Sequence, residues 1–297
     1  MLKHLKEKHS IQLKELQFAL QLIRKDPLML TSLIIIALLI FFGILAPYIA
    51  PYPQDALGAV SPENKLEPPS YEHLFGTDEL GRDVFSRVLF GIRISFKMAI
   101  IVVVLALLIG FPLGVVGGFL GGKTDEIIMR ITDIFLSFPS ILLALVICVM
   151  LGPSIDNVMI AIAVSWWPWY TRIAHGQAAS IRERTFIEAA KAAGIGKTKI
   201  ILRHIIPNSM APVLVQATMD LGSVLLTASS LSFLGLGAQP PTPEWGLMTY
   251  IGHTYLFTSW WCSTFPGLAI FFATLAFNLF GDGLRDILDP RTRRLLR

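Results

Sequence analysis

The chain has 297 residues, of which 54% are hydrophobic and only 15% are charged, and its mean hydropathy is +0.62. Soluble domains carry about 25% charged residues, so this composition excludes an ordinary soluble protein. The formal net charge of +4 gives no indication of a nucleic-acid partner. Cys148 and Cys262 lie far apart, in or beside apolar segments, and predict neither a disulfide framework nor a metal site.

The N-terminal segment, residues 1–26, is basic and amphipathic. Leu13, Leu16, Leu20 and Ile23 fall on one face of a helix, which favours a helix lying on the membrane surface. No short apolar core with a cleavage site follows it, so we do not expect a removable signal peptide.

Six membrane spans fit the apolar stretches that follow. A helix needs about 20 apolar residues to cross roughly 30 Å of hydrocarbon. The fourth stretch is the weakest, because only 15 uncharged residues separate Asp156 from Arg172. We place the spans at about 28–48, 95–119, 133–152, 157–174, 210–234 and 263–281.

Lysine and arginine predict how these spans are oriented. With six spans, 20 of the 25 Lys and Arg residues fall on the side that holds both termini. The positive-inside rule then places both termini in the cytoplasm of a cell-membrane protein. We expect residues 27–284 to form one transmembrane domain, with an external loop 49–94, a cytoplasmic loop 175–209 and a basic cytoplasmic tail 285–297.

The second span is rich in glycine. Gly110, Gly114 and Gly118 recur every four residues, a spacing that lets helix backbones approach closely. The stretch from Gly117 to Thr124 matches the phosphate-loop pattern G-x-x-x-x-G-K-[ST]. That loop works only between a strand and a helix. Because a spanning helix precedes it here, we interpret it as a flexible exit from the membrane.

Asp220 lies near the middle of the fifth span. A carboxylate there costs about 2.5–3.5 kcal/mol, so Asp220 is a candidate for facing a polar pathway, a partner chain or a water path. The alternative is a span shifted to about 221–238, which would leave Asp220 near the interface.

A polar, alanine-rich hairpin joins the fourth and fifth spans. We expect a helix from Ala178 to Ala193, ended by Gly194 in a left-handed conformation. Thr198 can cap a second short helix that runs to Ile206, and Pro207 sets the angle to the fifth span. Small side chains and basic residues favour either docking of a soluble protein or contact with anionic lipid headgroups.

Catalytic and metal-binding patterns are missing. The sequence contains neither H-E-x-x-H nor G-x-S-x-G, and its six histidines are not spaced as ligands of one metal. We therefore expect a non-catalytic chain without a cofactor of its own.

Four strings in the chain resemble one protein family. Glu188, Ala189, Ala190 and Gly194, followed by a string that ends at Pro207 and Asn208, resemble the EAA signature of permease subunits of ATP-binding-cassette importers. The family usually has isoleucine where this chain has His204, a departure that matches its peptide-transporter branch. The other strings, which resemble the same branch, are residues 75–87, 231–246 and 278–290.

The resemblance implies a fold and a mechanism. The chain is identified as a type I ABC importer permease for di- or oligopeptides, with an all-α fold, six transmembrane helices and a cytoplasmic coupling-helix hairpin. A homologous permease, two cytoplasmic ATPases that hold ATP and Mg²⁺, and an external solute-binding protein would be its partners in the bilayer. Glu188, Ala189, Ala190 and Gly194 would contact the ATPase, and Pro207 would fix the hairpin angle.

Other interpretations stay open. Closely similar permeases carry nickel chelates, glutathione or oligosaccharides. A stand-alone secondary carrier or channel would need a gating or ion-coupling site within the membrane, for which Asp220 is the one candidate. An intramembrane enzyme has no motif in its favour.

Overall fold

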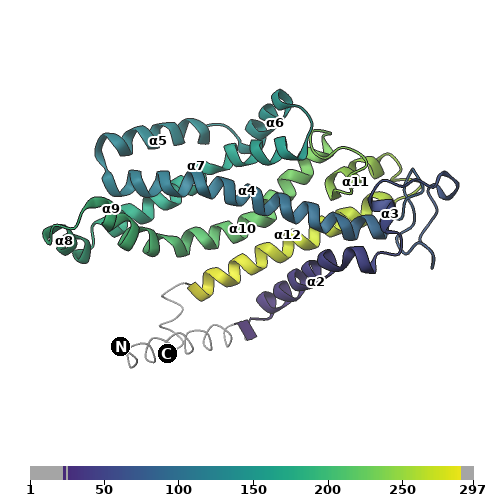
Figure 1. Cartoon of the computed structure of the whole chain (residues 1–297), viewed down its shortest axis with the longest axis horizontal. Coiled ribbons are helices and arrows are strands. Elements are labelled where there is room, and N and C mark those ends of the chain that lie inside the picture. The colour runs from purple at the N-terminus through teal and green to yellow at the C-terminus, as the bar shows by residue number, and fades with distance from the viewer. Residues whose placement is uncertain (1–22, 25, 289–297) are drawn as a thin grey trace.

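The structure, a computed structural model, describes residues 23–24 and 26–288, which fold into a bundle of long helices (Figure 1). Within these residues the only β-type pairing is an isolated bridge between Thr77 and Asp83. The predicted all-α architecture is confirmed. The elements are α2 (Pro27–Ile49), α3 (Pro53–Ala56), the 3-10 turn η1 (Pro62–Asn64), α4 (Val84–Leu120), α5 (Gly122–Leu136), α6 (Ser140–Leu151), α7 (Ile155–Arg182), α8 (Thr185–Ala192), α9 (Lys197–Ile200), the π-helical turn η2 (Ile201–Ile205), α10 (Ile206–Phe233), α11 (Trp245–His253) and α12 (Trp261–Leu288).

Several of the predicted spans are recovered. Within the described residues, four helices are long and apolar enough to cross a membrane, or five if one bent pair counts as a span. The first span begins and ends within one residue of its prediction, because Asp26 caps α2 by accepting hydrogen bonds from the Leu28 and Met29 backbone N–H groups. The four helices are Pro27–Ile49, Val84–Leu120, Lys197–Phe233 and Trp261–Ile287.

The third and fourth predicted spans differ from simple straight apolar helices. α5 and α6 meet at an angle of 83°, because Ser137 ends α5 and Pro139 precedes α6 without continuing the helix. The predicted span 133–152 is therefore bent and not one straight helix. α7 contains the predicted span 157–174 and is 28 residues long, but it falls outside the helices that are apolar enough to cross a membrane.

The glycine repeat of α4 packs against α7. A Cβ atom added at Gly110, Gly114 or Gly118 would overlap a backbone carbonyl oxygen of α7, at Trp167, Thr171 and His175 respectively. The two backbones are thus in direct contact along three turns, as the spacing predicts. This contact holds α7, and with it the start of the hairpin, at a fixed height beside α4.

The two ends of the bundle carry different structures (Figure 1). α8 and α9 lie at one end, which we call the hairpin end. α3, α11 and the loops around them lie at the opposite end, which we call the cap. The start of α2 and the end of α12 both point toward the hairpin end.

The predicted boundaries of the loop 49–94 need one correction. α4 begins at Val84, so residues 84–94 are helical and extend the second span by several turns into the cap. Because these turns contain charged residues, a search for apolar stretches does not detect them as part of the helix. The amphipathic helix expected within residues 1–26 and most of the tail 285–297 lie outside the described residues.

Candidate functional site: the hairpin at one end of the bundle

The hairpin begins with α8, which has one buried face and one exposed face. The side chains of Ile187 and Ala190, three residues apart, are buried in the main core cluster of the protein. Glu188 and Ala189 are exposed. Phe186 stands beside them with 42% of its surface exposed. Of the predicted contact residues, Glu188 and Ala189 are thus accessible, whereas Ala190 packs α8 against the core of the bundle.

Gly194 ends α8 in the predicted left-handed conformation, with φ of 75°. The Ile195 N–H donates to the Ala190 carbonyl at 3.1 Å and the Gly194 N–H to the Lys191 carbonyl at 3.0 Å. These two bonds form a Schellman motif, which satisfies the last carbonyls of a helix. The predicted helix from 178 to 193 is not continuous, since α7 ends at Arg182 and α8 starts at Thr185.

The second arm of the hairpin runs directly into α10. α9, η2 and α10 form one 37-residue helical stretch from Lys197 to Phe233. The prediction that Thr198 caps a separate helix is wrong, because Gly196 is the N-cap residue and Thr198 lies inside α9. Pro207 does not break the helix. The π-helical turn immediately before it fits a proline that cannot donate a backbone hydrogen bond.

A hollow of about 630 Å³ separates the hairpin from the end of α4. Arg182, Lys191 and Lys197 line it together with Phe119 and Gly194. Arg182 donates to the Gly118 carbonyl at 3.2 Å, and the Lys191 ammonium lies 5.8 Å from the centre of the Phe119 ring. The hairpin end is therefore positively charged around an exposed, alanine-rich helix.

Asp220 lies in the middle of α10 with 8% of its surface exposed. It accepts a hydrogen bond from Gln216 at 2.8 Å and lies beside Tyr170 of α7. Because α10 ends at Phe233, a span at 221–238 does not form. The structure thus places Asp220 at a contact between two helices, and its role in a pathway stays a prediction.

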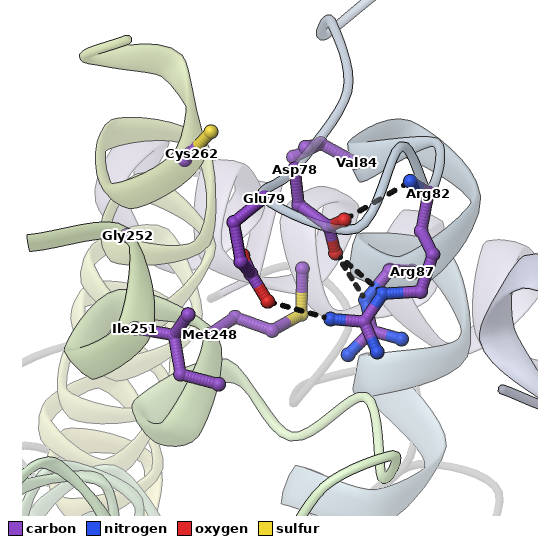
Figure 2. Close-up of a pocket in the computed structure, with 9 residues that line it drawn as sticks. All are labelled: Asp78, Glu79, Arg82, Val84, Arg87, Met248, Ile251, Gly252 and Cys262. Carbon is purple, nitrogen blue, oxygen red and sulfur yellow. Dashed lines mark hydrogen bonds and ion pairs between the residues drawn. The ribbon is translucent and has the colours of Figure 1, made fainter. Parts of the chain in front are cut away.

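The cap holds a buried cluster of charges that sequence reasoning did not find (Figure 2). Asp78 lies between two arginines: Arg82 Nε donates to it at 2.7 Å, and Arg87 Nε lies 3.5 Å away. Arg82 also pairs with Glu79 at 3.0 Å. Arg87, which is 2% exposed, donates to the Pro241 carbonyl at 3.2 Å. The cluster ties the loop before α4 to the loop before α11.

Two buried carboxylates cap helices in the same region. Asp83 accepts from the Ser86 N–H at 2.7 Å and lies 2.9 Å from His73 Nδ1. Glu244 accepts from the Gly246 and Leu247 backbone N–H groups in the first turn of α11, at 2.8 Å each. Burial raises the pKa of Glu244, partly offset by these two hydrogen bonds, and burial also raises the pKa of Asp55 and Glu79.

Tryptophan side chains complete the links within the cap. Trp245 donates its ring N–H to the Val88 carbonyl, and Trp261 donates to the Thr77 carbonyl, each at 3.0 Å. Residues 75–87 and 231–246, which resemble the same family, are therefore joined in space. The hollow that Figure 2 shows among the charges measures only about 10 Å³, close to the smallest volume that holds one water. The hollow is too small for a sizeable ligand, and the cluster connects the loops of the cap.

The phosphate-loop pattern falls between two helices. Gly117 lies in the last turn of α4, and Gly121 and Gly122 form the turn into α5. Without a preceding strand, this segment lacks the cradle that a nucleotide needs. Among the described residues, no group of three or more His, Cys, Asp and Glu side chains is placed to hold a metal ion.

Two family models match the chain. Residues 110–294 match the family described as binding-protein-dependent transport system inner membrane component. Residues 16–69 match the N-terminal TM domain of oligopeptide transport permease C. The first match covers more than half of the chain, including the whole hairpin.

Curated relatives are similar over nearly their full length. A probable D,D-dipeptide transport system permease of Escherichia coli K12 is 46% identical, over 91% of this chain and 90% of the relative. A dipeptide transport system permease of Alkalihalophilus pseudofirmus is 44% identical, over 93% and 90%. A glutathione transport system permease of Escherichia coli O157:H7 is 43% identical, over 91% and 88%.

The fold is also found among solved structures. A chain of the inward-facing MetNI methionine ABC transporter superposes with a TM-score of 0.56 at 18% identity, covering 69% of this chain and 98% of that chain. Membership of the family of binding-protein-dependent transport components implies an ATPase and a substrate-binding protein as partners. The chain thus belongs to the family of binding-protein-dependent transport system inner membrane components, as a multi-pass membrane subunit and not an enzyme.

Proposed function

We propose that this chain pairs with a homologous permease to form the path by which an ATP-driven importer takes up di- or oligopeptides. The observation that carries the proposal is the similarity to dipeptide permeases, at 41–46% identity over about nine tenths of the chain. Residues 27–284 would form the permease domain, flanked by an N-terminal segment and a basic tail.

The hairpin end would face the cytoplasm, and the cap would face outward. The start of α2 and the end of α12 both point toward the hairpin end, which fits two termini on the basic side of the membrane. The binding protein would then deliver its cargo at the cap. Two ATPases, which bind ATP and Mg²⁺, would dock at the hairpins of the two permeases.

Glu188 and Ala189 would make the direct contact with an ATPase, since both are exposed on α8. Ala190 and Gly194 would act by holding α8 in shape, through the buried face and the Schellman motif. Pro207 would set the course of the helix between α9 and α10. Motion of the ATPases would reach the spans through this hairpin.

Cargo is tested by reconstitution. The complex, with its ATPases and binding protein, is placed in liposomes, and ATP-dependent uptake of radiolabelled dipeptides is compared with that of glutathione. We expect dipeptide uptake that requires ATP. Uptake of glutathione alone would overturn the peptide assignment and favour the alternative that the 43% identical glutathione permeases represent.

A stand-alone carrier makes a different prediction. It would transport without ATP and would purify without an ATPase, whereas the importer requires both ATPases and a second permease. Affinity purification of the tagged full-length chain from mild detergent, followed by mass spectrometry, separates the two. Purification of the chain alone in active form would contradict the proposed assembly.

A further inference from the structure

The cap side of the bundle contains a second hollow, of about 490 Å³, that carries charges of both signs. Arg93 and Lys97 line it from α4, and Asp156 lines it from the first turn of α7. Its remaining walls are mostly apolar and include Phe90, Met98 and Met159. Pockets for small molecules commonly measure roughly 300–1,000 Å³ and combine apolar walls with a few polar groups.

The position of the two cations follows from the length of α4. At ~1.5 Å per residue, its 37 residues make a helix far longer than the ~30 Å of hydrocarbon. The uncharged stretch that starts at Met98 is long enough to cross the membrane by itself. Arg93 and Lys97 therefore stand at the outer edge of the membrane, where cargo would enter the pathway.

The three charged side chains have no partner among the residues that the structure describes. No hydrogen bond or ion pair in residues 26–288 engages the side chains of Arg93, Lys97 or Asp156. This contrasts with Arg82 and Arg87 nearby, which are fully engaged in the cap. Like charges four residues apart repel on a helix, so an anion between Arg93 and Lys97 would relieve the repulsion.

The charges that line the hollow are complementary to those of a small zwitterion. Side chains at positions i and i+4 have Cβ atoms about 5–6 Å apart, so Arg93 and Lys97 can both reach one carboxylate. Asp156 can accept from an ammonium group, and its place at a helix N-terminus stabilises its negative charge. A dipeptide places its terminal charges roughly 7 Å apart when extended, at about 3.3–3.6 Å per residue.

We infer that this hollow is a receiving site for dipeptide cargo: Arg93 and Lys97 bind the C-terminal carboxylate, Asp156 binds the N-terminal ammonium, and the apolar walls contact the side chains. The inference rests on the proposed function, because it assumes peptide cargo that enters at the cap. It adds that the permease itself recognises the free amino and carboxyl termini of the peptide. A phosphatidylethanolamine headgroup has the same pair of charges, so the test must separate a lipid from a peptide.

The experiment measures binding of tritiated dialanine to the assembled complex in lipid nanodiscs, with the binding protein omitted. Dialanine is compared with its C-terminal amide and its N-acetyl form. We expect each blocked terminus of the peptide to weaken its binding to the unaltered complex by about tenfold, the effect of losing one charge-assisted hydrogen bond.

Matched variants assign each terminus. The double variant Arg93→Gln, Lys97→Gln should bind the free acid and the amide equally. Asp156→Asn should bind the free amine and the acetyl form equally. Lys65→Gln, which removes an exposed cation of the cap that does not line the hollow, should keep the preferences of the unaltered protein. Arg93→Lys and Asp156→Glu retain the charges and should retain the preferences, which guards against misfolding as an explanation.

Three results would overturn the inference. In the first, the unaltered complex imports dipeptides with its binding protein but shows no preference for free termini in the nanodisc assay. This result would exclude the site and leave the proposed function unaffected. Competition by phosphatidylethanolamine, seen when nanodiscs with and without that lipid are compared, assigns the site to lipid. An unaltered complex that imports no dipeptide removes both the cargo and the site.

Discussion

The hairpin end and the cap differ in how they use charged residues. In the cap, one cluster of charged side chains is buried and paired, as Arg87 and Asp78 are, and it joins loops distant in sequence. On the hairpin, Glu188 and Lys191 are exposed on a helix whose buried face is apolar. Residues 75–87, which hold most of this buried charge cluster, therefore serve the folding of the cap. The hairpin residues are free to contact another protein.

The largest effect on transport should come from Glu188→Lys. Removing a partner from a charged interface typically costs at least ~2 kcal/mol, so we expect ATPase binding and uptake to fall by about thirtyfold or more. Because Glu188 is exposed, thermal stability of the isolated chain should stay within ~0.5 kcal/mol. Uptake into proteoliposomes and co-purification of the ATPase are the measurements.

Glu63→Lys serves as the control for that charge reversal, since Glu63 is an exposed acid of the cap. It should leave ATPase binding unchanged. Equal loss in both variants would show that overall charge, and not the hairpin contact, decides the outcome.

Arg87→Met should give the largest loss of stability. It leaves the buried Asp78 carboxylate with one cation in place of two, and breaking a buried ion pair costs about 3–5 kcal/mol. Thermal unfolding of the detergent-solubilised protein measures the effect. Lys65→Met, at an exposed cation of the same region, should change stability by less than ~0.5 kcal/mol. If both variants unfold at the same temperature, the charge cluster does not stabilise the cap.

Gly194→Ala should have an intermediate effect that is confined to the hairpin. A left-handed conformation costs a residue with a Cβ roughly 1–2 kcal/mol, although open space surrounds Gly194. We expect faster amide hydrogen exchange in α8 and unchanged exchange in the cap. Gly196→Ala is a matched control two residues away, also in open space but with φ of −61°, and it should exchange as the unaltered protein does.

The smallest effect concerns pH and Glu244. Burial raises the pKa of Glu244 above its value in the unfolded chain, so the folded state binds more protons between the two values. Stability should fall as pH rises through that raised pKa. Glu244→Gln should make the melting temperature less dependent on pH above the ordinary pKa of a glutamate side chain. Glu63→Gln, at an exposed position, should keep the slope of the unaltered protein. An unchanged slope in Glu244→Gln would contradict the assignment.

Local features of the fold could be predicted from local sequence. Asp26 and Pro27 mark the start of α2, and Gly194 indicates a left-handed turn, because each acts within a few residues of its own position. Gly110, Gly114 and Gly118 likewise predict a close helix contact. The start of α4 was misplaced because hydropathy reports on lipid contact, whereas most of residues 84–94 are buried or partly buried against protein.

Features that depend on distant residues could not be predicted. Arg87 donates to Pro241, which is 154 residues away in sequence, and no pattern near Arg87 shows this. The 83° bend between α5 and α6 was hidden because the surrounding residues are uniformly apolar, although Pro139 marked the place. The exposed contact residues of the hairpin were proposed through family resemblance, since the contact proposed for them is with another protein.

The continuous helix from Lys197 to Phe233 has a mechanical consequence. Its 37 residues make a stiff rod of about 55 Å at ~1.5 Å per residue. One tip belongs to the hairpin. Near the other tip, Gly246 of α11 rests directly on the Ser229 backbone. Tilting such a lever at Lys197 must shift α11 at the far surface of the bundle. The π-helical turn at Ile201–Ile205 is where this helix bends most easily. The stiffness of that single turn therefore determines how much of a tilt at Lys197 reaches α11.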